Sequence, residues 1–306
     1  MSRLLLVTGL WPTPDRPSAG IFVKRRVAGQ AITVVAPASY SGPMPVRYAR
    51  LALRALTTRG RFAGVEAHPL FPAGLIGLLA ARLRRVPLVV YAHGADVRET
   101  AQENATYRFL AKYVVRRAAA VVANSADTAA MVARLGGSPA VIPPGVDLEA
   151  FRPTPRPAMR RVLYLGGTEA RKGYDVAQAH ADTLLGPGLE TLSPERVAAT
   201  IGEHDIVLVP SRDEPYGLVA AEAIACGRWV VARRVGGLAS IVEEGLSGTL
   251  VDDDRDFAAA LRSVPDYDPF DVAARAERFS LEAANRAMAQ LWERVITPSA
   301  GTTERS

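Results

Sequence analysis

The sequence predicts an α/β protein with two doubly wound parallel sheets. Short apolar runs alternate with helical patterns along most of the 306 residues, as expected of parallel sheets built from βαβ units. Residues 151–158 hold three prolines in eight positions, so they cannot continue a helix or a central strand. The length suits two domains of about 150 residues each. We therefore expect one domain on each side of a proline-rich linker.

In the first domain, residues 1–150, strands are expected to alternate with helices. The predicted strands are 4–8, 32–36, 65–67, 88–92, 120–123 and 140–142. The predicted helices include 73–85, 106–117 and 126–135. The first of these ends before Pro87, because the residue before a proline disfavours the helical conformation. Gly136 and Gly137 end the third.

The linker is assigned to residues 151–160 and the second domain to 161–280. The predicted strands of this domain are 161–165, 206–210, 229–232 and 249–251. An amphipathic helix at 281–296 follows, and we expect it to pack back toward the N-terminal domain. The polar tail, 297–306, is expected to be disordered. Ligands of such sheets bind at the carboxyl ends of strands, and clefts between domains are favoured positions.

The composition excludes several classes of protein. Hydrophobic residues make up 49% and charged residues 22%, as in ordinary globular proteins, and no apolar run approaches the roughly 18 residues of a membrane span. The apolar core at residues 4–7 is too short for a signal peptide. The lone cysteine, Cys226, excludes an intrachain disulfide framework and a multi-cysteine metal site. We expect a cytoplasmic protein.

The net charge of +6 is unevenly distributed. Residues 1–150 hold 19 Lys and Arg against 8 Asp and Glu, whereas residues 151–306 hold 18 against 23. A basic first half suggests an anionic partner such as a membrane surface, although arginines spread over solvated faces give the same counts. The apolar and basic segment 74–85 suits peripheral docking on an anionic membrane, and a helix packed on its sheet is the alternative. Nucleic acid is not expected, because no recognised binding motif is present.

The most informative stretch lies in the second domain. The strand D-I-V-L-V-P-S leads into a loop with Glu214 and Gly217, and a helix with Glu222 follows. Seven residues separate the two acids, so they can address different parts of one ligand. Gly217 allows a close approach, and the amides of Gly217, Leu218 and Val219 at the helix start suit a phosphate or sugar hydroxyls. The alternative is one more βα unit with solvated acids.

Further motifs follow one another in a fixed order along the chain. They are L-W-P-T-P-D-R-P-S-A-G-I-F-V-K-R-R, Y-A-H-G-A-D-V, A-N-S-A-D-T-A-A-M-V-A-R-L-G, V-I-P-P-G-V-D-L-E-A-F-R-P, L-Y-L-G-G-T-E-A-R-K-G-Y-D, E-P-Y-G-L-V-A-A-E-A-I-A-C-G-R-W-V-V-A and V-G-G-L-A-S-I-V-E-E-G-L-S-G-T-L-V. In this order they resemble the family 4 retaining glycosyltransferases. The resemblance covers most of the chain, and the ordered set is more specific than any single motif.

The resemblance implies a GT-B fold, in which two Rossmann-like doubly wound domains face each other across a cleft. It implies transfer of a sugar from a nucleotide-sugar donor to an acceptor hydroxyl, with retention of configuration and an oxocarbenium-like transition state. The acceptor would be a glycan, a lipid-linked sugar or a small molecule. No cofactor or metal is expected, since the nucleotide sugar is a co-substrate. Asp252, Asp253 and Asp254 are better explained as a solvated helix cap.

The resemblance also implies roles for single residues. The donor-binding set is Gly20, Arg171, Lys172, Glu214, Gly217, Leu218, Val219 and Glu222. Glu222 would bind the ribose, Glu214 the transferring sugar, and Lys172 the pyrophosphate, on which charge develops in the transition state. The catalytic set is His93, Lys172 and Glu214. In the first domain His93 would lie near the phosphate and sugar, and Gly20 would present backbone amides. The candidate acceptor residues are His68, Asn124 and Ser125; for His68 a structural role is the alternative.

The sequence departs from the family pattern in two ways. Gly167 stands where an arginine usually helps to hold the pyrophosphate, and Arg171 is the nearest substitute; one lost charge-assisted contact would cost roughly 1.5–3 kcal/mol. The second domain also looks shortened after Gly173, where a strand and a helix are missing and residues 190–193 remain for base recognition. Ser193 and the proline after it mark a helix start.

These departures keep two alternatives open. One is a catalytically degenerate paralogue that binds a sugar nucleotide or a partner protein. The other, less favoured, is a nucleotide-sugar epimerase, which would need a base beside the sugar and no acceptor. The retention of Glu214, Glu222, Lys172 and His93 favours an active transferase.

Overall fold

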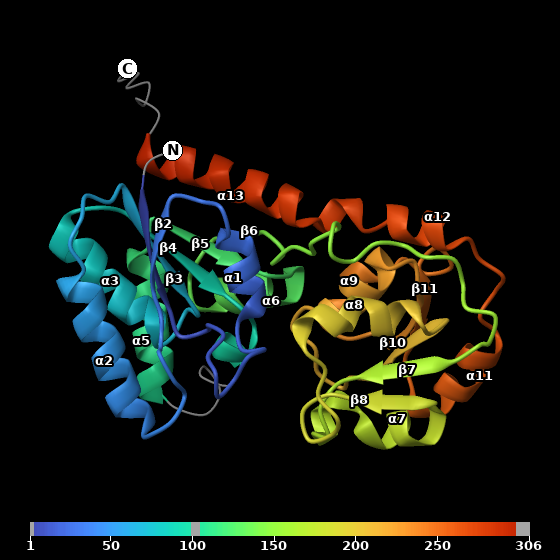
Figure 1. Ribbon diagram of the computed structural model, residues 1–306. Helices are drawn as coiled ribbons and strands as arrows, with labels where there is room; N and C mark the ends of the chain where they lie inside the picture. Colours follow the sequence, from blue (N-terminus) through green and yellow to red (C-terminus); the bar gives the residue numbers. More distant parts are fainter. Residues whose placement is uncertain (1–2, 99–104, 298–306) are drawn as a thin grey trace. The chain divides into compact units, whose positions relative to one another are not determined.

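The chain divides into two units, each built around its own parallel sheet (Figure 1). The computed structural model describes residues 3–98 and 105–297. Of these, the first unit contains 3–98, 105–124, 128–142 and 284–297, and the second contains 125–127 and 143–283. Residues 298–306 of the predicted tail lie outside the described residues.

The sheet of the first unit has six parallel strands in the order β2-β1-β3-β4-β5-β6. The strands are β1 (Leu4–Thr8), β2 (Ile32–Val35), β3 (Gly64–His68), β4 (Leu88–Ala92), β5 (Ala120–Ala123) and β6 (Ala140–Val141). The helices are α1 (Ile21–Val27), α2 (Met44–Thr57), α3 (Ala73–Arg84), α5 (Ala105–Arg117), α6 (Ala126–Arg134) and α13 (Leu281–Ile296). Strands β1, β4 and β5 have the predicted bounds; β2 and β6 end one residue earlier than predicted, and β3 is one residue longer at both ends.

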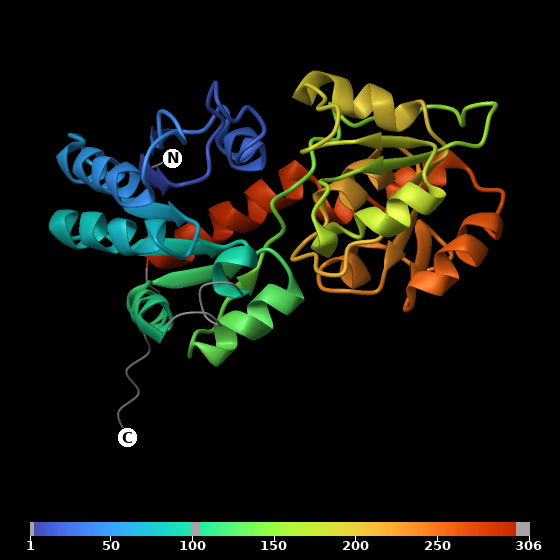
Figure 2. The same cartoon turned by 90° about the horizontal axis from the view of Figure 1, so that it is seen from below.

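Helices cover both faces of this sheet (Figure 2). On one face, side chains of α2, α3 and α5 pack on Val65 and Val90. On the other face, Met288 and Leu291 of α13 pack on Val89, and α1 packs nearby. Neighbouring residues of a strand point to opposite faces, which explains why the adjacent Val89 and Val90 serve different layers. The continuous apolar runs of the sequence are therefore strands buried on both sides.

The basic helix α3 is packed against β3. Gly77 lies so close to the sheet that a Cβ atom there would be 2.7 Å from the Cβ of Ala67. The guanidinium of Arg84 donates hydrogen bonds to the carbonyls of Ala55, Thr58 and Ala80. Of the two interpretations of segment 74–85, the helix packed on its sheet therefore describes the structure. No helix among residues 3–98 and 105–297 is long and apolar enough to cross a membrane.

The second unit contains a five-stranded parallel sheet in the order β11-β10-β9-β7-β8. The strands are β7 (Val162–Leu165), β8 (Thr183–Leu185), β9 (Ile206–Val209), β10 (Trp229–Arg233) and β11 (Gly248–Val251). The α-helices are α7 (Tyr174–His180), α8 (Pro194–Gly202), α9 (Leu218–Ala225), α10 (Leu238–Ile241), α11 (Phe257–Arg262) and α12 (Pro269–Ala274). The predicted helix start after Ser193 is confirmed. Strand β8, in the region that looks shortened, was not predicted.

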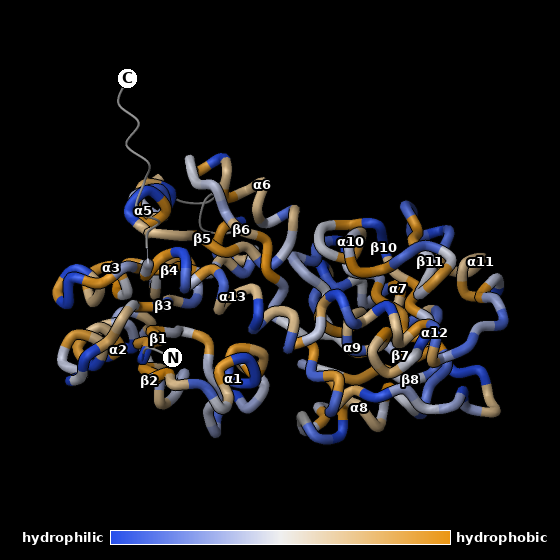
Figure 3. The backbone as a smooth tube through the Cα atoms, turned by 90° about the horizontal axis from the view of Figure 1, so that it is seen from above, coloured by the Kyte–Doolittle hydropathy of each residue, from blue (hydrophilic) through white to orange (hydrophobic). Residues whose placement is uncertain are grey.

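Apolar residues gather along the strands of each unit (Figure 3). In the second unit Ile206, Val207 and Leu208 of β9 are all almost completely buried. The proline-rich linker is held to this unit by the buried Arg228, which donates to the carbonyls of Thr154 and Gly202 at 2.9 Å each. The linker thus has a fixed course in spite of having no regular structure.

Candidate functional site

Lys172 and Glu214 come together at the carboxyl ends of β7 and β9. These strands pair in parallel, so the loops that follow them leave the same edge of the sheet. Nζ of Lys172 donates to Oε2 of Glu214 at 2.7 Å, and Oγ of Ser211 donates to the same oxygen at 3.4 Å. Both members of the ion pair reach solvent, with 24% of the Lys172 side chain and 13% of the Glu214 side chain exposed. A cation and an anion are therefore presented together at a ligand-binding edge.

The loop after Glu214 leads into α9 through Gly217. This glycine has a φ of 104°, and a Cβ atom there would lie 2.6 Å from Cδ2 of Leu238. Only glycine combines that backbone conformation with so close a neighbour. The first-turn amides of α9 begin directly after it, and such amides have no partner within their own helix. The predicted amide set of Gly217, Leu218 and Val219 thus lies at a helix start next to Glu214.

A pair of glycines supports this loop from behind. The N–H of Gly237 donates to the carbonyl of Glu214 at 2.9 Å, and Cβ atoms at Gly236 or Gly237 would collide with the carbonyls of Glu214 and Tyr216. The sequence shows this pair as V-G-G, but its supporting role was not predicted. The signal in the sequence is a pair of consecutive glycines in the loop that follows β10 and passes the site.

The other predicted donor residues are placed less directly. Glu222 is half-buried in the middle of α9. Arg171 points to solvent and pairs with Glu169 at 2.9 Å, with about half of each side chain exposed. A Cβ atom at Gly167 would lie 3.5 Å from the carbonyl oxygen of Pro187, an ordinary contact. The backbone therefore has room for a side chain where the usual arginine is absent.

The three consecutive aspartates serve as caps and ion-pair partners. Asp253 accepts from the N–H of Arg255 at 3.0 Å, as a helix cap does. Asp254 pairs with Arg212 at 2.8 Å and with Arg233. Within the described ranges, no group of three or more His, Cys, Asp or Glu side chains is placed to hold a metal ion.

In the first unit, His68 and His93 lie at the ends of the neighbouring strands β3 and β4. Nδ1 of His68 is 2.9 Å from Nε2 of His93, and Nε2 of His68 is 2.7 Å from Oε1 of Glu66. Glu66 is fully buried, forms an ion pair with the buried Arg26, and accepts from Nε1 of Trp292 at 3.1 Å. Glu66, Arg26 and Trp292 were not predicted. The available signal was a glutamate two positions before His68 in a buried strand, which puts both on one face.

The backbone around His93 is held from two sides. Asp96, in the helical turn 95–98, accepts from the N–H of His93 at 2.9 Å and from that of Leu70 at 2.6 Å. Nδ2 of Asn124 donates to the carbonyl of His93 at 2.8 Å. Two predicted acceptor residues, His68 and Asn124, thus surround His93. The third, Ser125, belongs to the second unit and donates to the carbonyl of Pro215 at 2.7 Å.

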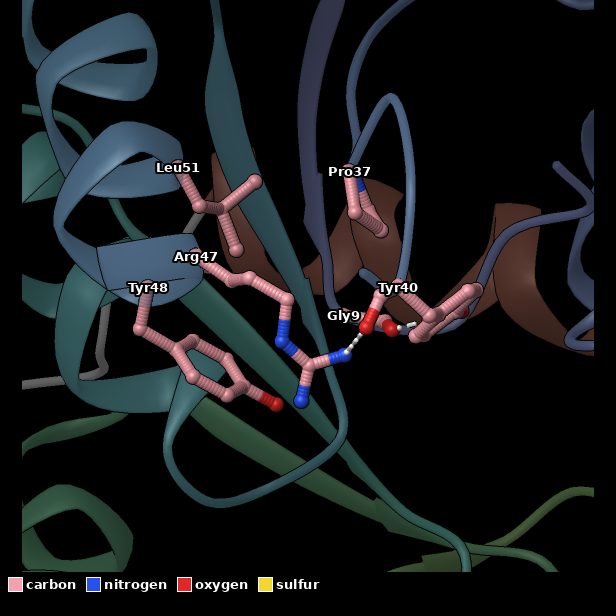
Figure 4. Close-up of a pocket in the computed structure, with 6 residues that line it drawn as sticks. All are labelled: Gly9, Pro37, Tyr40, Arg47, Tyr48 and Leu51. Carbon is pink, nitrogen blue, oxygen red and sulfur yellow. Dashed lines mark hydrogen bonds between the residues drawn. The ribbon is translucent and has the colours of Figure 1, made fainter. Parts of the chain in front are cut away.

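A small cavity of about 40 Å³ opens at the carboxyl ends of β1 and β2 (Figure 4). Its lining residues are Gly9, Pro37, Tyr40, Arg47, Tyr48 and Leu51. Arg47 donates from one terminal nitrogen to the carbonyl of Tyr40 at 2.9 Å, whereas its Nε has no hydrogen-bond partner among the described residues. The hydroxyl of Tyr40 donates to the carbonyl of Gly9 at 2.9 Å. The cavity therefore combines aromatic walls with one guanidinium.

Gly20 is the residue that precedes α1, and it has a φ of 65°. A Cβ atom there would collide with the backbone of Leu10. The glycine therefore brings the start of α1 against the loop that follows β1, at the same sheet edge as the cavity.

The sequence matches known proteins over nearly its whole length. Residues 6–150 match the family model described as Glycosyltransferase Family 4, and residues 146–265 match the one described as Glycosyl transferases group 1. A protein of Catenulispora acidiphila, D-inositol 3-phosphate glycosyltransferase 2, is 30% identical over 317 residues, covering 80% of this chain and 74% of that protein. The chain belongs to the family 4 glycosyltransferases.

Other similar proteins agree with this family assignment. The D-inositol 3-phosphate glycosyltransferase of Geodermatophilus obscurus is 34% identical over 301 residues, covering 78% of this chain. The chain spans 65% of the length of that relative. Two solved structures share the GT-B fold at 19% identity: Anabaena HepE in complex with UDP and glucose, with a TM-score of 0.71 over 95% of this chain and 99% of HepE, and sucrose-phosphate synthase from Thermosynechococcus elongatus, with 0.74 over 96% and 99%. The predicted family and fold are confirmed.

Burial of the histidine pair makes the stability of this glycosyltransferase depend on pH. Burial, and then the charge of Arg26, lower the pKa of His68 well below its usual 6.5. Burial, followed by His68 and Arg26, has the same effect on the pKa of His93. Burial raises the pKa of Asp96 to about 6 from its ordinary 3.8.

We expect the first unit to lose stability as the pH falls below 6.5. There the unfolded chain binds a proton at each histidine and the folded chain does not, so the unfolded state is favoured. Asp96 acts oppositely between pH 6 and 3.8, because it holds its proton only when folded. Between pH 6 and pH 3.8, two groups against one leave a net loss of about 1.4 kcal/mol per pH unit. Urea unfolding at a series of pH values measures the slope; a constant free energy from pH 7 to pH 5 would contradict it.

Proposed function

We propose that this glycosyltransferase moves a sugar from a nucleotide-sugar donor to an acceptor hydroxyl, with retention of configuration. The observation that carries the proposal is the Lys172–Glu214 ion pair beside the start of α9. In this role Nζ of Lys172 neutralises the diphosphate as it leaves, and Glu214 holds hydroxyls of the transferring sugar. Glu222 binds the ribose.

The proposed reaction needs no separate general base. The leaving diphosphate oxygen takes the proton of the acceptor hydroxyl on the face where the new bond forms, so configuration is retained. Lys172 supplies a positive charge where other transferases use a cation, which supports a metal-independent reaction. His93 contributes a polar group of the first unit toward the sugar or the phosphate.

We also propose that the acceptor is a small hydroxylic molecule that carries a negative charge. Two relatives are named for D-inositol 3-phosphate. In the first unit, the cavity of Figure 4 holds Arg47 with an unused Nε, and a guanidinium is a good partner for phosphate. Association with an anionic membrane surface remains a prediction from the basic composition. A lipid-linked acceptor would be consistent with such an association.

A thermal-shift screen tests the donor part of the proposal. The purified chain is measured with UDP, GDP, ADP and dTDP and their common sugars, with and without EDTA. We expect one nucleotide to raise the melting temperature in the wild type and in a Lys112→Ala control, an exposed lysine of the first unit, but not in Lys172→Ala. No shift with any nucleotide in a folded protein would favour the degenerate paralogue.

Product analysis tests the acceptor and separates the epimerase. With the stabilising nucleotide sugar, myo-inositol 3-phosphate and myo-inositol are offered in parallel. Transfer to the phosphate, reduced by Arg47→Met, is expected. An isomerised nucleotide sugar with no acceptor product would instead establish the epimerase.

A further inference from the structure

A continuous line of hydrogen bonds runs from a buried carboxylate to His93. It passes from Oε1 of Glu66 to Nε2 of His68 at 2.7 Å, and from Nδ1 of His68 to Nε2 of His93 at 2.9 Å. Both nitrogens of the His68 ring are used, so turning the ring over would replace two nitrogens by carbons and lose both bonds. The ring orientation is therefore determined by its partners.

The carboxylate decides where the protons lie. Arg26 forms a buried ion pair with Glu66, which keeps the carboxyl group ionised and able only to accept. Nε2 of His68 must then carry a hydrogen, since two acceptors at 2.7 Å would repel each other. A guanidinium nitrogen of Arg26 lies 3.4 Å from the same Nε2, too far to compete with the shorter bond.

In neutral His68, the position of the ring hydrogen determines the position of the ring hydrogen on His93. With its hydrogen on Nε2, His68 offers a lone pair at Nδ1. Nε2 of His93 must then donate, and Nδ1 of His93 is left as the acceptor. Among the described residues, Nδ1 of His93 has no hydrogen-bond partner. The His93 ring stacks on the Tyr91 ring, with 4.7 Å between the ring centroids, and this contact fixes its orientation.

We propose that Glu66 and His68 are positioning residues that fix His93 as the Nε2–H tautomer, so that Nδ1 of His93 accepts a hydrogen bond from a substrate hydroxyl. The tautomer follows from the first unit alone. The role of Nδ1 toward a hydroxyl rests on the proposed function. In the other tautomer Nδ1–H would donate to the hydroxyl oxygen, so the hydroxyl's own hydrogen would lose this acceptor.

The tautomer is measured directly by two-bond ¹⁵N–¹H spectra of protein labelled at histidine. The chain has four histidines, and single His→Gln variants assign their signals. We expect a pyrrole-type Nε2 and a pyridine-type Nδ1 for both His68 and His93 at pH 7. A pyrrole-type Nδ1 on His93 in the wild type would overturn the proposal, whatever the activity of the enzyme.

Variants of His68 test whether this line of bonds matters for catalysis. His68→Asn keeps a polar group near His93 but loses the bond to Glu66, so its amide can turn over and both tautomers of His93 should appear. We expect kcat to fall about tenfold, equivalent to about 1.4 kcal/mol, with the donor KM little changed. His180→Asn is the matched control, because it makes the same replacement at a histidine of α7 in the second unit that is not part of this line of hydrogen bonds.

The outcomes separate the two proposals. Mixed tautomers with reduced kcat support the inference, and an unchanged His93 tautomer with wild-type kcat in His68→Asn contradicts it. If His68→Asn does not fold, the wild-type spectrum still decides the tautomer. If the chain transfers no sugar at all, the proposed function fails, whereas the assignment of the His93 protons stands or falls on the spectrum.

Discussion

Replacing Glu214 with alanine is expected to lower kcat by about 10²–10³-fold while leaving the affinity for the nucleoside diphosphate nearly unchanged. The carboxylate lies 2.7 Å from Nζ of Lys172, so both groups act in one small region. We assign Glu214 to the sugar and Lys172 to the diphosphate, which divides their effects. The folded state should survive, because the ion pair is partly exposed and contributes about 1 kcal/mol or less.

Three further variants make this division measurable. Lys172→Ala should lose both diphosphate affinity and kcat, because the charge that it neutralises is present in the donor and grows in the transition state. Glu222→Ala should mainly weaken nucleotide binding. Glu203→Ala removes an exposed glutamate after α8 and serves as the control. Calorimetric titration with the nucleoside diphosphate and initial rates give both quantities; an equal loss of binding in Glu214→Ala and Glu222→Ala would refute the assignment.

Most of the fold was predictable because parallel sheets leave a strong local signal. Strands β4 and β5 are short apolar runs, and their bounds were predicted without error. The helix α2 was not identified, although its arginines and leucines alternate with a helical period. Strand β8 was missed because it is only three residues long and lies at an edge of the sheet, where few contacts constrain its sequence.

The site was predictable only in part. The resemblance indicated Lys172 and Glu214, and the pairing of β7 with β9 explains why residues 42 positions apart meet. The surroundings of Glu66 were not predictable, because its partners come from helices 40 and 226 positions away. A sequence shows that a glutamate interrupts an apolar strand, but which side chains satisfy it depends on how distant helices pack.

Replacing Arg26 with methionine is expected to destabilise the first unit by about 3–5 kcal/mol. Arg26 and Glu66 are both almost fully buried, and burial lowers the pKa of Arg26 to about 10. Without the guanidinium, the carboxylate keeps only neutral donors and must either remain ionised without its counter-charge or take up a proton. For a unit of this size the melting temperature should fall on the order of 10 °C. Scanning calorimetry measures it, and the second unit provides an internal reference, since two units need not unfold together.

The control and the double variant decide whether charge is the cause. Lys24→Met makes the same kind of replacement at an exposed position of α1 and should change stability by less than about 0.5 kcal/mol. Arg26→Met combined with Glu66→Gln removes both charges, so it should be more stable than Arg26→Met alone. If the double variant were less stable than either single one, the cost would come from lost packing. A rescue would show that Glu66 holds its charge inside the fold, which is the condition that orders the protons of His68 and His93.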